Sequence, residues 1–400
     1  MTQLAISKRV RLMVPSATLG MAAAARELAD QGIDVAILSA GEPDFDTPQE
    51  ICDIAKASID KGKTHYVPVR GTKAMISALQ HKFLRDQGVA YAADEVMCTV
   101  GAKAALMMAM MAILEEGDEV ILCAPFWVSY REQVNLLGAK PVIITCKAED
   151  NFMPTGESLR SALSSKTKAI IINSPNNPSG GVISKSQLEE LALAVKDTNI
   201  WIVSDEIYEK LLFGNAVHYS PAALSDDMRE RTLVISGASK GYAMTGWRVG
   251  FVAGNKNIIK AMGNLQGQET TCLPEFIQDA ASFAMLEDAN LRAKINSMGK
   301  AYAERKALFI RLFKQMPLVK IFEPQGAFYI WADFSAYINK EVGEKIIKDD
   351  IDLATRMLKE AHVACVPGTP FGISGYLRFS IASAPSEIEK AAVRISQWLK

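Results

Sequence analysis

The sequence is poor in the residues that build disulfide frameworks and metal sites. Its 400 residues contain only six cysteines and four histidines. The cysteines are scattered without a Cys-x-x-Cys pair, several lie in apolar runs, and no two histidines stand at helical spacing. We therefore expect buried free thiols in a reducing compartment, and no metal site.

The chain also lacks an excess of charge of either sign and any long apolar run. Its formal net charge is -1, which argues against a basic surface for nucleic acid or a polybasic patch for membranes. The most hydrophobic helix candidate, residues 104–114, is too short to span a bilayer. Residues 1–11 carry charges and no apolar core, so we expect no secretory signal and a cytoplasmic protein without nucleic-acid or membrane partners.

Short apolar runs alternate with helical patterns in the middle of the chain. Seven runs are strand candidates: 96–100, 120–123, 141–145, 169–172, 201–203, 233–235 and 249–253. Such alternation predicts an α/β fold, whose large domain has a mostly parallel seven-stranded sheet between helices and binds ligands at the carboxyl ends of its strands. A long charged amphipathic stretch at 290–316 and the strand candidates 327–332, 363–366 and 376–381 predict a smaller α+β domain. We expect the large domain to comprise residues 48–290 and the small domain residues 1–47 and 291–400.

A lysine follows one of these predicted strands. The run 233–235 leads into Ser236-Gly237-Ala238-Ser239-Lys240-Gly241, which places Lys240 at the mouth of the sheet rather than on a solvated helix face. A desolvated lysine is a usable nucleophile, and Arg248 offers a guanidinium that suits phosphate. Taken alone, the stretch fits an ordinary solvated lysine equally well.

Two other predicted strand ends suit a phosphorylated planar ligand. Gly101, Ala102 and Lys103 stand where a strand meets an Ala-rich helix, and the backbone N–H groups at a helix start bind anions. Trp127 follows the next strand and can offer its face to a planar ring. Each has a plainer interpretation, the first as a tight packing turn and the second as a lid over the core.

Polar side chains follow two further strands. Asn177 lies in a stiff turn rich in Asn and Pro, and Asp205 and Tyr208 come directly after the run 201–203. Asp205 can pair with a protonated ring nitrogen while Tyr208 donates to a ring oxygen, although a helix-capping Asp is the simpler alternative. Arg378 lies inside a strand pattern, where a buried guanidinium calls for an anion such as a carboxylate.

Together these motifs resemble the fold type I pyridoxal-phosphate enzymes, and closely the bacterial subgroup of the aspartate aminotransferase family. The resemblance covers nearly the whole chain and is carried by Pro15-Ser16-Ala17-Thr18, the loop 41–48, Tyr66-x-Pro68, Gly101-Ala102-Lys103, Pro125-x-Trp127-x-Ser129-Tyr130, Asn176-Asn177-Pro178-Ser179-Gly180, Ser204-Asp205-Glu206-Ile207-Tyr208 and the Lys240 stretch. The last three together are highly specific. The resemblance implies transamination between aspartate and 2-oxoglutarate by a ping-pong mechanism, with an amino acid and a 2-oxo acid as substrates, in a homodimer with shared active sites.

The resemblance also implies a role for each cofactor-binding residue. Lys240 would bind pyridoxal 5'-phosphate covalently and later move a proton at the substrate Cα. Asp205 would keep the pyridine nitrogen protonated, so that the ring accepts electrons. The ring hydroxyl would be bound by Tyr208 and Asn177, the ring face by Trp127, and the phosphate by Gly101, Ala102, Lys103 and Arg248, joined by Tyr66 of the partner subunit.

The substrate positions follow from the same resemblance. Arg378 would bind the α-carboxylate, with Gly41 touching the same group, while Trp127 and Asn177 would also line the substrate site. Ser16 and Lys103 would face the side-chain carboxylate of aspartate. Gly237 stands where some relatives place a phosphate-binding serine, so that contact is either missing or supplied by Ser239.

Other functions fit parts of the sequence. Gly237-Ala238-Ser239-Lys240-Gly241 matches the nucleophile elbow of hydrolases, but only His362 lies downstream and no His-Gly-Gly loop exists. A pyridoxal-phosphate-binding regulator needs an added DNA-binding module, for which neither length nor charge leaves room. Within the family, a transaminase for aromatic or other amino acids or for prephenate, or a lyase, remains the alternative. Arg70 and Glu269 depart from the family pattern and leave the substrate range open.

Overall fold

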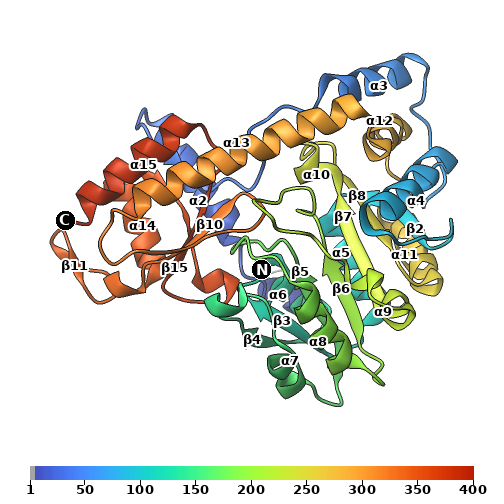
Figure 1. The fold of residues 1–400 in the computed structure, drawn as a ribbon, viewed down its shortest axis with the longest axis horizontal. Coiled ribbons are helices and arrows are strands. Elements are labelled where there is room, and N and C mark those ends of the chain that lie inside the picture. The colour runs from blue at the N-terminus through green and yellow to red at the C-terminus, as the bar shows by residue number, and fades with distance from the viewer. Residues whose placement is uncertain (1–4) are drawn as a thin grey trace.

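The computed structural model describes residues 5–400 and is built around a large β-sheet flanked by helices (Figure 1). Its strands are β2 (Val96–Val100), β3 (Glu119–Ala124), β4 (Lys140–Thr145), β5 (Thr167–Asn173), β6 (Trp201–Asp205), β7 (Thr232–Gly237) and β8 (Val249–Ala253). The strand order is β2-β8-β7-β6-β5-β3-β4, and only β8 runs antiparallel to its neighbours. The predicted seven-stranded, mostly parallel sheet is therefore confirmed.

Both faces of this sheet are apolar because successive residues of its strands point to opposite sides. In β5, Ala169 and Ile171 pack in one core cluster with α5, while Ile170 and Ile172 pack in another with α8. The helices and 3-10 turns of this part of the chain are α3 (Gln49–Asp60), α4 (Lys73–Gln87), α5 (Ala102–Ile113), α6 (Ser129–Leu136), η1 (Ala148–Asp150), α7 (Gly156–Ala162), α8 (Lys185–Val195), η2 (Pro221–Ala223), α9 (Asp226–Arg231), α10 (Ala238–Gly241), α11 (Lys256–Glu269) and α12 (Glu275–Leu286). Helices on both faces bury these runs, as an α/β fold requires.

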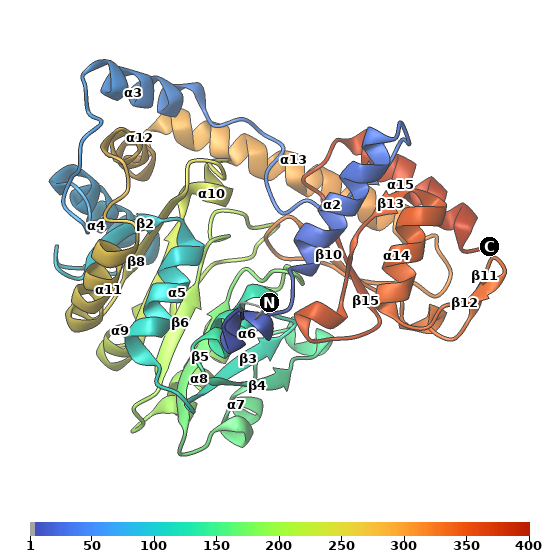
Figure 2. The same cartoon turned by 180° about the vertical axis from the view of Figure 1, so that it is seen from behind.

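A second, antiparallel sheet is formed by the C-terminal part of the chain, seen from behind in Figure 2. Its order is β14 (Val366–Pro367), β15 (Tyr376–Ser380), β10 (Tyr329–Asp333) and β9 (Lys320–Phe322). The remaining elements here are α13 (Ala289–Phe313), η3 (Ser335–Tyr337), β11 (Glu341–Val342), β12 (Lys345–Ile346), α14 (Asp350–Ala361), β13 (Val363–Ala364), η4 (Thr369–Phe371) and α15 (Pro385–Trp398). Helix α13 matches the predicted long amphipathic stretch and runs from α12 toward α14 and α15 (Figure 1).

The N-terminal segment joins this C-terminal part. It contains α1 (Lys8–Arg11), α2 (Ala17–Asp30) and β1 (Ala36–Ile37), and β1 pairs in parallel with β13. The segment therefore lies beside elements more than three hundred residues away in the chain. The exact domain boundaries at residues 47/48 and 290/291 stay a prediction.

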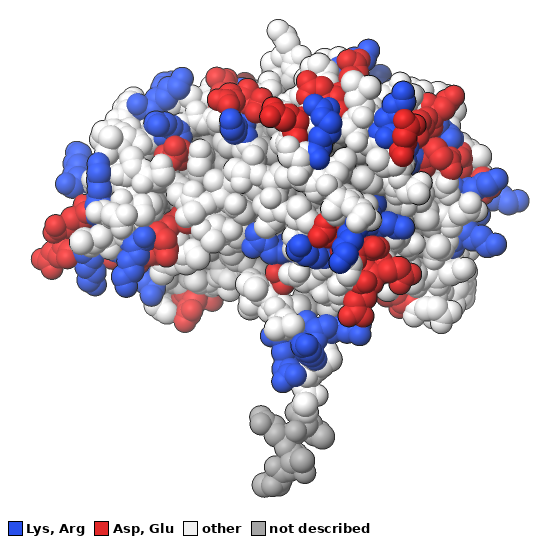
Figure 3. Space-filling model, turned by 90° about the horizontal axis from the view of Figure 1, so that it is seen from below, with Lys and Arg blue, Asp and Glu red and all other residues white. Residues whose placement is uncertain are grey.

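The charged surface and the state of the cysteines can both be compared with the sequence analysis. On the face shown in Figure 3, basic and acidic side chains are interspersed, apart from a basic group beside the grey N-terminal residues. Between residues 5 and 400, no helix combines the length and the apolar character needed to cross a membrane. All six cysteines are free, and Cys98, Cys123, Cys146 and Cys365 are buried.

Candidate active site

Three neighbouring parallel strands end at the same edge of the large sheet. Strand β5 ends at Asn173, β6 ends at Asp205, and β7 ends just before α10, which carries Lys240. The side chain of Asn173 links two of these ends: its Nδ2 donates to Asp205 O at 2.9 Å, and its Oδ1 accepts from the backbone N–H of Asn177 at 2.8 Å. The fold thus gathers residues from separate motifs at one place, as the parallel sheet predicts.

Lys240 lies in a partly buried position beside the N-terminal loop. Its Nζ donates a hydrogen bond to Gly41 O at 2.5 Å. Burial lowers the pKa of Lys240 to about 8, helped by the nearby charges of Arg378 and Arg248 and opposed by the carboxylates of Glu42 and Asp205. The amine is therefore neutral in a substantial fraction of molecules at mildly alkaline pH, which a nucleophile requires.

The lowered pKa of Lys240 predicts selective acylation of this residue in protein freed of bound small molecules. Because only the neutral amine reacts, we expect half-maximal modification near pH 8, against the ordinary lysine value of about 10.5. Mass spectrometry after brief treatment with acetic anhydride at increasing pH measures this for each lysine separately. A midpoint for Lys240 near the ordinary value would contradict the proposed desolvation.

Asp205 is a buried carboxylate that, among residues 5–400, accepts hydrogen bonds from two neutral donors. Tyr130 Oη donates to its Oδ2 at 2.5 Å, and the backbone N–H of Ile207 donates to its Oδ1 at 3.2 Å. Burial raises the pKa of Asp205 to about 6, although both hydrogen bonds lower it. A carboxylate in this setting gains from a cationic partner, such as the protonated ring nitrogen that the sequence predicts.

Arg378 is a buried cation that none of the carboxylates among residues 5–400 pairs with. Its side chain is 1% exposed, and its Nη1 and Nη2 donate to Asn177 Oδ1 and Ser39 O, each at 3.0 Å. The guanidinium carbon lies 4.4 Å from the ring centre of Tyr329, and Nε has no hydrogen-bond partner within residues 5–400. Burial lowers the pKa of Arg378. An uncompensated buried charge is costly, so the arrangement suits an incoming carboxylate.

The start of α5 forms a cradle against Arg248. Gly101 has φ +85°, a backbone conformation that favours glycine, and a Cβ there would lie 2.5 Å from Arg248 Nη2 and would displace the guanidinium. Arg248 Nη1 donates to Thr245 O at 2.9 Å. The first N–H groups of a helix have no partner within the helix, so Ala102 and Lys103 present donors beside this guanidinium. The arrangement can bind a phosphate.

The remaining predicted residues lie around this centre in different ways. Ser16, Lys103 and Arg248 line one cleft of about 1220 Å³. Lys103 Nζ lies 4.8 Å from the ring centre of Trp127, and burial together with Arg248 lowers the pKa of Lys103. Tyr66 is 87% exposed, which leaves it accessible to a second subunit.

Two of the predicted residues have local roles that the sequence did not indicate. Ser16 Oγ caps α2 by accepting from Leu19 N at 3.4 Å. A Cβ on Gly237 would lie 2.6 Å from Val249 O, so this packing excludes a serine there; Ser239, which is 7% exposed, lies two residues later in α10.

Three residues of the site were missed by sequence reasoning. Tyr130 holds Asp205, Tyr329 Oη shares a hydrogen bond of 2.9 Å with Tyr208 Oη, and Ser39 O accepts from Arg378. Tyr130 belongs to the motif in which the sequence analysis singled out Trp127. Tyr329 lies in the predicted strand 327–332. The contact of Tyr329 with Arg378 depends on the pairing of β10 with β15, and no local signal predicts that pairing.

The chain is similar to known aminotransferases over almost its whole length. Residues 33–395 match the family described as aminotransferase class I and II. An aspartate aminotransferase of Bacillus sp. (strain YM-2) is 42% identical, with 99% of each chain covered. An aspartate/prephenate aminotransferase of Thermus thermophilus is 40% identical, with 98% of each covered. The solved structure of the Thermus thermophilus aspartate aminotransferase with maleate superposes with a TM-score of 0.93 at 39% identity, covering 99% of this chain and 100% of that one.

Proposed function

The chain belongs to the aminotransferase class I and II family, and on this premise we propose that it transfers the amino group of aspartate to 2-oxoglutarate by a ping-pong mechanism. Family membership establishes transamination as the reaction and pyridoxal 5'-phosphate as the cofactor. The observation that supports a carboxylate-bearing substrate best is Arg378, a buried guanidinium without an anionic partner in residues 5–400.

The residues of the site fit this cofactor. The cradle of Gly101 and Arg248 suits its phosphate, and the buried carboxylate of Asp205 suits a protonated pyridine nitrogen. Asn177 accepts from Arg378 through Oδ1, which leaves its Nδ2 as a donor for the ring hydroxyl. The hydroxyl group of Tyr208, the other residue expected to bind the ring hydroxyl, shares a hydrogen bond with the hydroxyl group of Tyr329. Lys240 supplies an amine of lowered pKa for covalent attachment.

The protein side chains then perform binding and proton transfer. When bound, the cofactor supplies a ring that withdraws electrons from the substrate Cα. Arg378 binds the α-carboxylate and so fixes the substrate in the site. Lys240 would hold the cofactor, and its Nζ, once free, would act as the base that takes the proton from the substrate Cα and later gives it back. The cofactor would carry the amino group from the first substrate to the second 2-oxo acid, and water would supply the oxygen of the 2-oxo acid that is released.

A dicarboxylate substrate is supported by the residues that line the cleft beside Arg248. Lys103 and Ser16 both line it, and Lys103 lies over Trp127 in a position where burial lowers its pKa. The similar Thermus thermophilus enzyme was solved with maleate, itself a dicarboxylate. These observations favour recognition of the aspartate side chain by Lys103.

Lys103→Ala is expected to lower kcat/KM for aspartate by about 10- to 100-fold, the range for losing a hydrogen bond to a charged group. Phenylalanine, which has no side-chain carboxylate, should lose much less and serves as the internal control. Steady-state rates with 2-oxoglutarate as acceptor measure both. If wild-type protein prefers another donor, the aspartate assignment fails while transamination stands.

Prephenate is the second candidate acceptor, because one similar protein is named an aspartate/prephenate aminotransferase. Comparison of prephenate with 2-oxoglutarate as acceptor for the wild-type protein tests it directly. Activity with both would place the chain with that relative; activity with 2-oxoglutarate alone would favour the narrower range.

We also propose a cytoplasmic homodimer with shared active sites. The support for the shared site is Tyr66, an aromatic side chain that is 87% exposed within one chain although the family resemblance implies that it binds the cofactor phosphate. Tyr66→Phe should then weaken cofactor binding without changing the mass in sedimentation experiments. A fully active monomer would contradict the shared site.

A further inference from the structure

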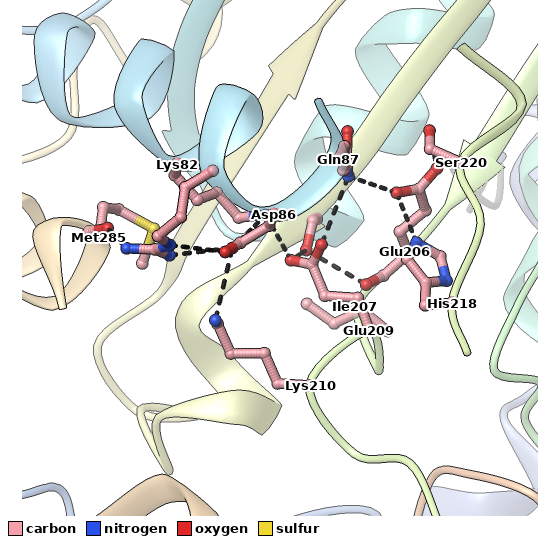
Figure 4. A network of polar contacts seen from close by, with 12 residues as sticks. Lys82, Asp86, Gln87, Glu206, Ile207, Glu209, Lys210, His218, Ser220 and Met285 are labelled. Carbon is pink, nitrogen blue, oxygen red and sulfur yellow. Dashed lines mark hydrogen bonds and ion pairs between the residues drawn. The ribbon is translucent and has the colours of Figure 1, made fainter. Parts of the chain in front are cut away.

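The turn that follows β6 presents different residues to its two sides. Asp205 and Tyr208 contact Tyr130 and Tyr329 in the candidate site. Glu206 and Glu209 enter a buried polar network next to α4 (Figure 4). The backbone N–H of Glu209 donates to Glu206 O at 3.0 Å and closes the turn between the two. The residues that face the candidate site and those that enter the network thus belong to one short hydrogen-bonded turn.

Glu206 is held by four side-chain donors. Its Oε1 accepts from Ser204 Oγ at 2.8 Å and from Ser220 Oγ at 2.7 Å. Its Oε2 accepts from Gln87 Nε2 at 2.5 Å and pairs with His218 Nε2 at 2.9 Å. A carboxylate has about four lone-pair sites, so Glu206 is saturated. The position of its carboxylate is consequently fixed by four separate side chains.

Glu209 is the buried partner of a buried lysine. Its Oε1 lies 2.7 Å from Lys82 Nζ and accepts from Ser236 Oγ at 3.0 Å, while Gln87 Nε2 reaches Oε2 at 3.3 Å. Burial alone would raise the pKa of Glu209 and lower that of Lys82, but their mutual attraction reverses both shifts. The pair is therefore ionised in the interior, with Asp86 at 3.4 Å from the same lysine.

Glu206, Glu209 and His218 are close enough together to hold a metal ion. Each carboxylate oxygen already accepts a hydrogen bond, however, and Lys82 supplies a positive charge. Burial lowers the pKa of His218, but the Glu206 and Glu209 carboxylates outweigh this and raise it, which disfavours the neutral form that binds metals. The carboxylate oxygens that a metal ion would need are therefore already engaged within the network.

Stability alone is a weak reason for such a network. Removing charges from water is costly, and buried ion pairs are often replaceable by apolar residues without loss of stability. Their value then lies in fixing a geometry. We propose that Glu206, Glu209, Gln87 and Lys82 are positioning residues, which hold the turn so that Asp205 and Tyr208 meet the ring of the cofactor. This inference rests on the proposed function.

Glu206→Ala is the direct test of positioning. It should raise the dissociation constant for pyridoxal phosphate by about 10- to 100-fold, the size found when groups that orient metal ligands are removed. We expect kcat to fall with it, while KM for aspartate changes little because Arg378 and Lys103 are untouched. Glu206→Gln keeps an acceptor for Ser204 and Ser220 and should restore most of the affinity. Cofactor release from the holoenzyme, followed by visible absorbance, measures this.

Two further variants separate positioning from stability. Glu360→Gln breaks an ion pair of 2.8 Å with Arg356 in α14; it should lower the unfolding temperature and leave cofactor affinity unchanged. Gln87→Met removes the link between the two glutamates and provides the test if Glu206→Ala does not fold. Wild-type affinity and absorbance in the folded Glu206 or Gln87 variants would overturn the inference. Failure of wild-type protein to bind the cofactor would instead reject the proposed function.

Discussion

Lys240→Ala is expected to reduce kcat by about 100,000-fold or more, the scale observed when a covalent nucleophile is removed. Lys240 combines attachment of the cofactor with movement of the proton at Cα, and among residues 5–400 no other lysine follows β7 in α10. Its Nζ already lies 2.5 Å from Gly41 O, in the loop predicted to touch the substrate carboxylate. Stopped-flow measurement of each half-reaction records the loss of proton transfer. The visible absorbance of the purified protein records the loss of cofactor attachment.

Lys256→Ala is the matched control for this substitution. Lys256 is an exposed lysine at the first position of α11 and carries none of the proposed roles. The control should keep both activity and absorbance, while circular dichroism should show that Lys240→Ala folds normally. If Lys240→Ala kept the absorbance band of the lysine-bound cofactor, another residue would have to be the attachment point.

Much of the fold follows from local patterns in the sequence. The seven strands of the large sheet were predicted within a few residues because each is a short apolar run between helical segments. Strand β9, Lys320–Phe322, escaped prediction since it is short and only partly buried, and its state depends on pairing with β10. The periodicity of apolar residues indicates which residues are buried. It does not indicate which distant strand pairs with a given strand.

The residues of the candidate site also divide into those that local patterns predict and those that depend on contacts between distant parts of the chain. Lys240, Asp205 and Asn177 were predicted because each follows an apolar strand and belongs to a specific motif. Tyr329 and Ser39 were not, although both contact the Arg378 guanidinium. Their contribution arises only when β10, β15 and the N-terminal loop come together. Gly101 lies between these cases: the helix start was visible, whereas the clash that any Cβ would make with Arg248 required coordinates.

Arg378→Met is expected to lower kcat/KM for aspartate by roughly 30- to 5,000-fold, which corresponds to the cost of truncating one member of a buried charge pair. The Arg378 guanidinium is buried, and its Nη1 and Nη2 are held in place by hydrogen bonds to Asn177 Oδ1 and Ser39 O. This arrangement suits the binding of a carboxylate. The loss should appear mainly in KM. β-Alanine, which is aspartate without its α-carboxylate, should react slowly with the wild type and no more slowly with the variant.

The same substitution should leave the stability of the ligand-free protein unchanged or raise it. Without a bound carboxylate, Arg378 is a desolvated charge whose Nε lacks a hydrogen-bond partner in the described part of the chain, and burial lowers the pKa of Arg378. Methionine fills much of the same space without a charge, so the ligand-free variant should unfold at the wild-type temperature or above it. The wild type alone should gain stability when the dicarboxylate maleate is added, because only it retains the cation that binds the ligand. Equal stabilisation of both proteins by maleate would show that the carboxylate binds elsewhere, and Arg378 would then be a structural residue.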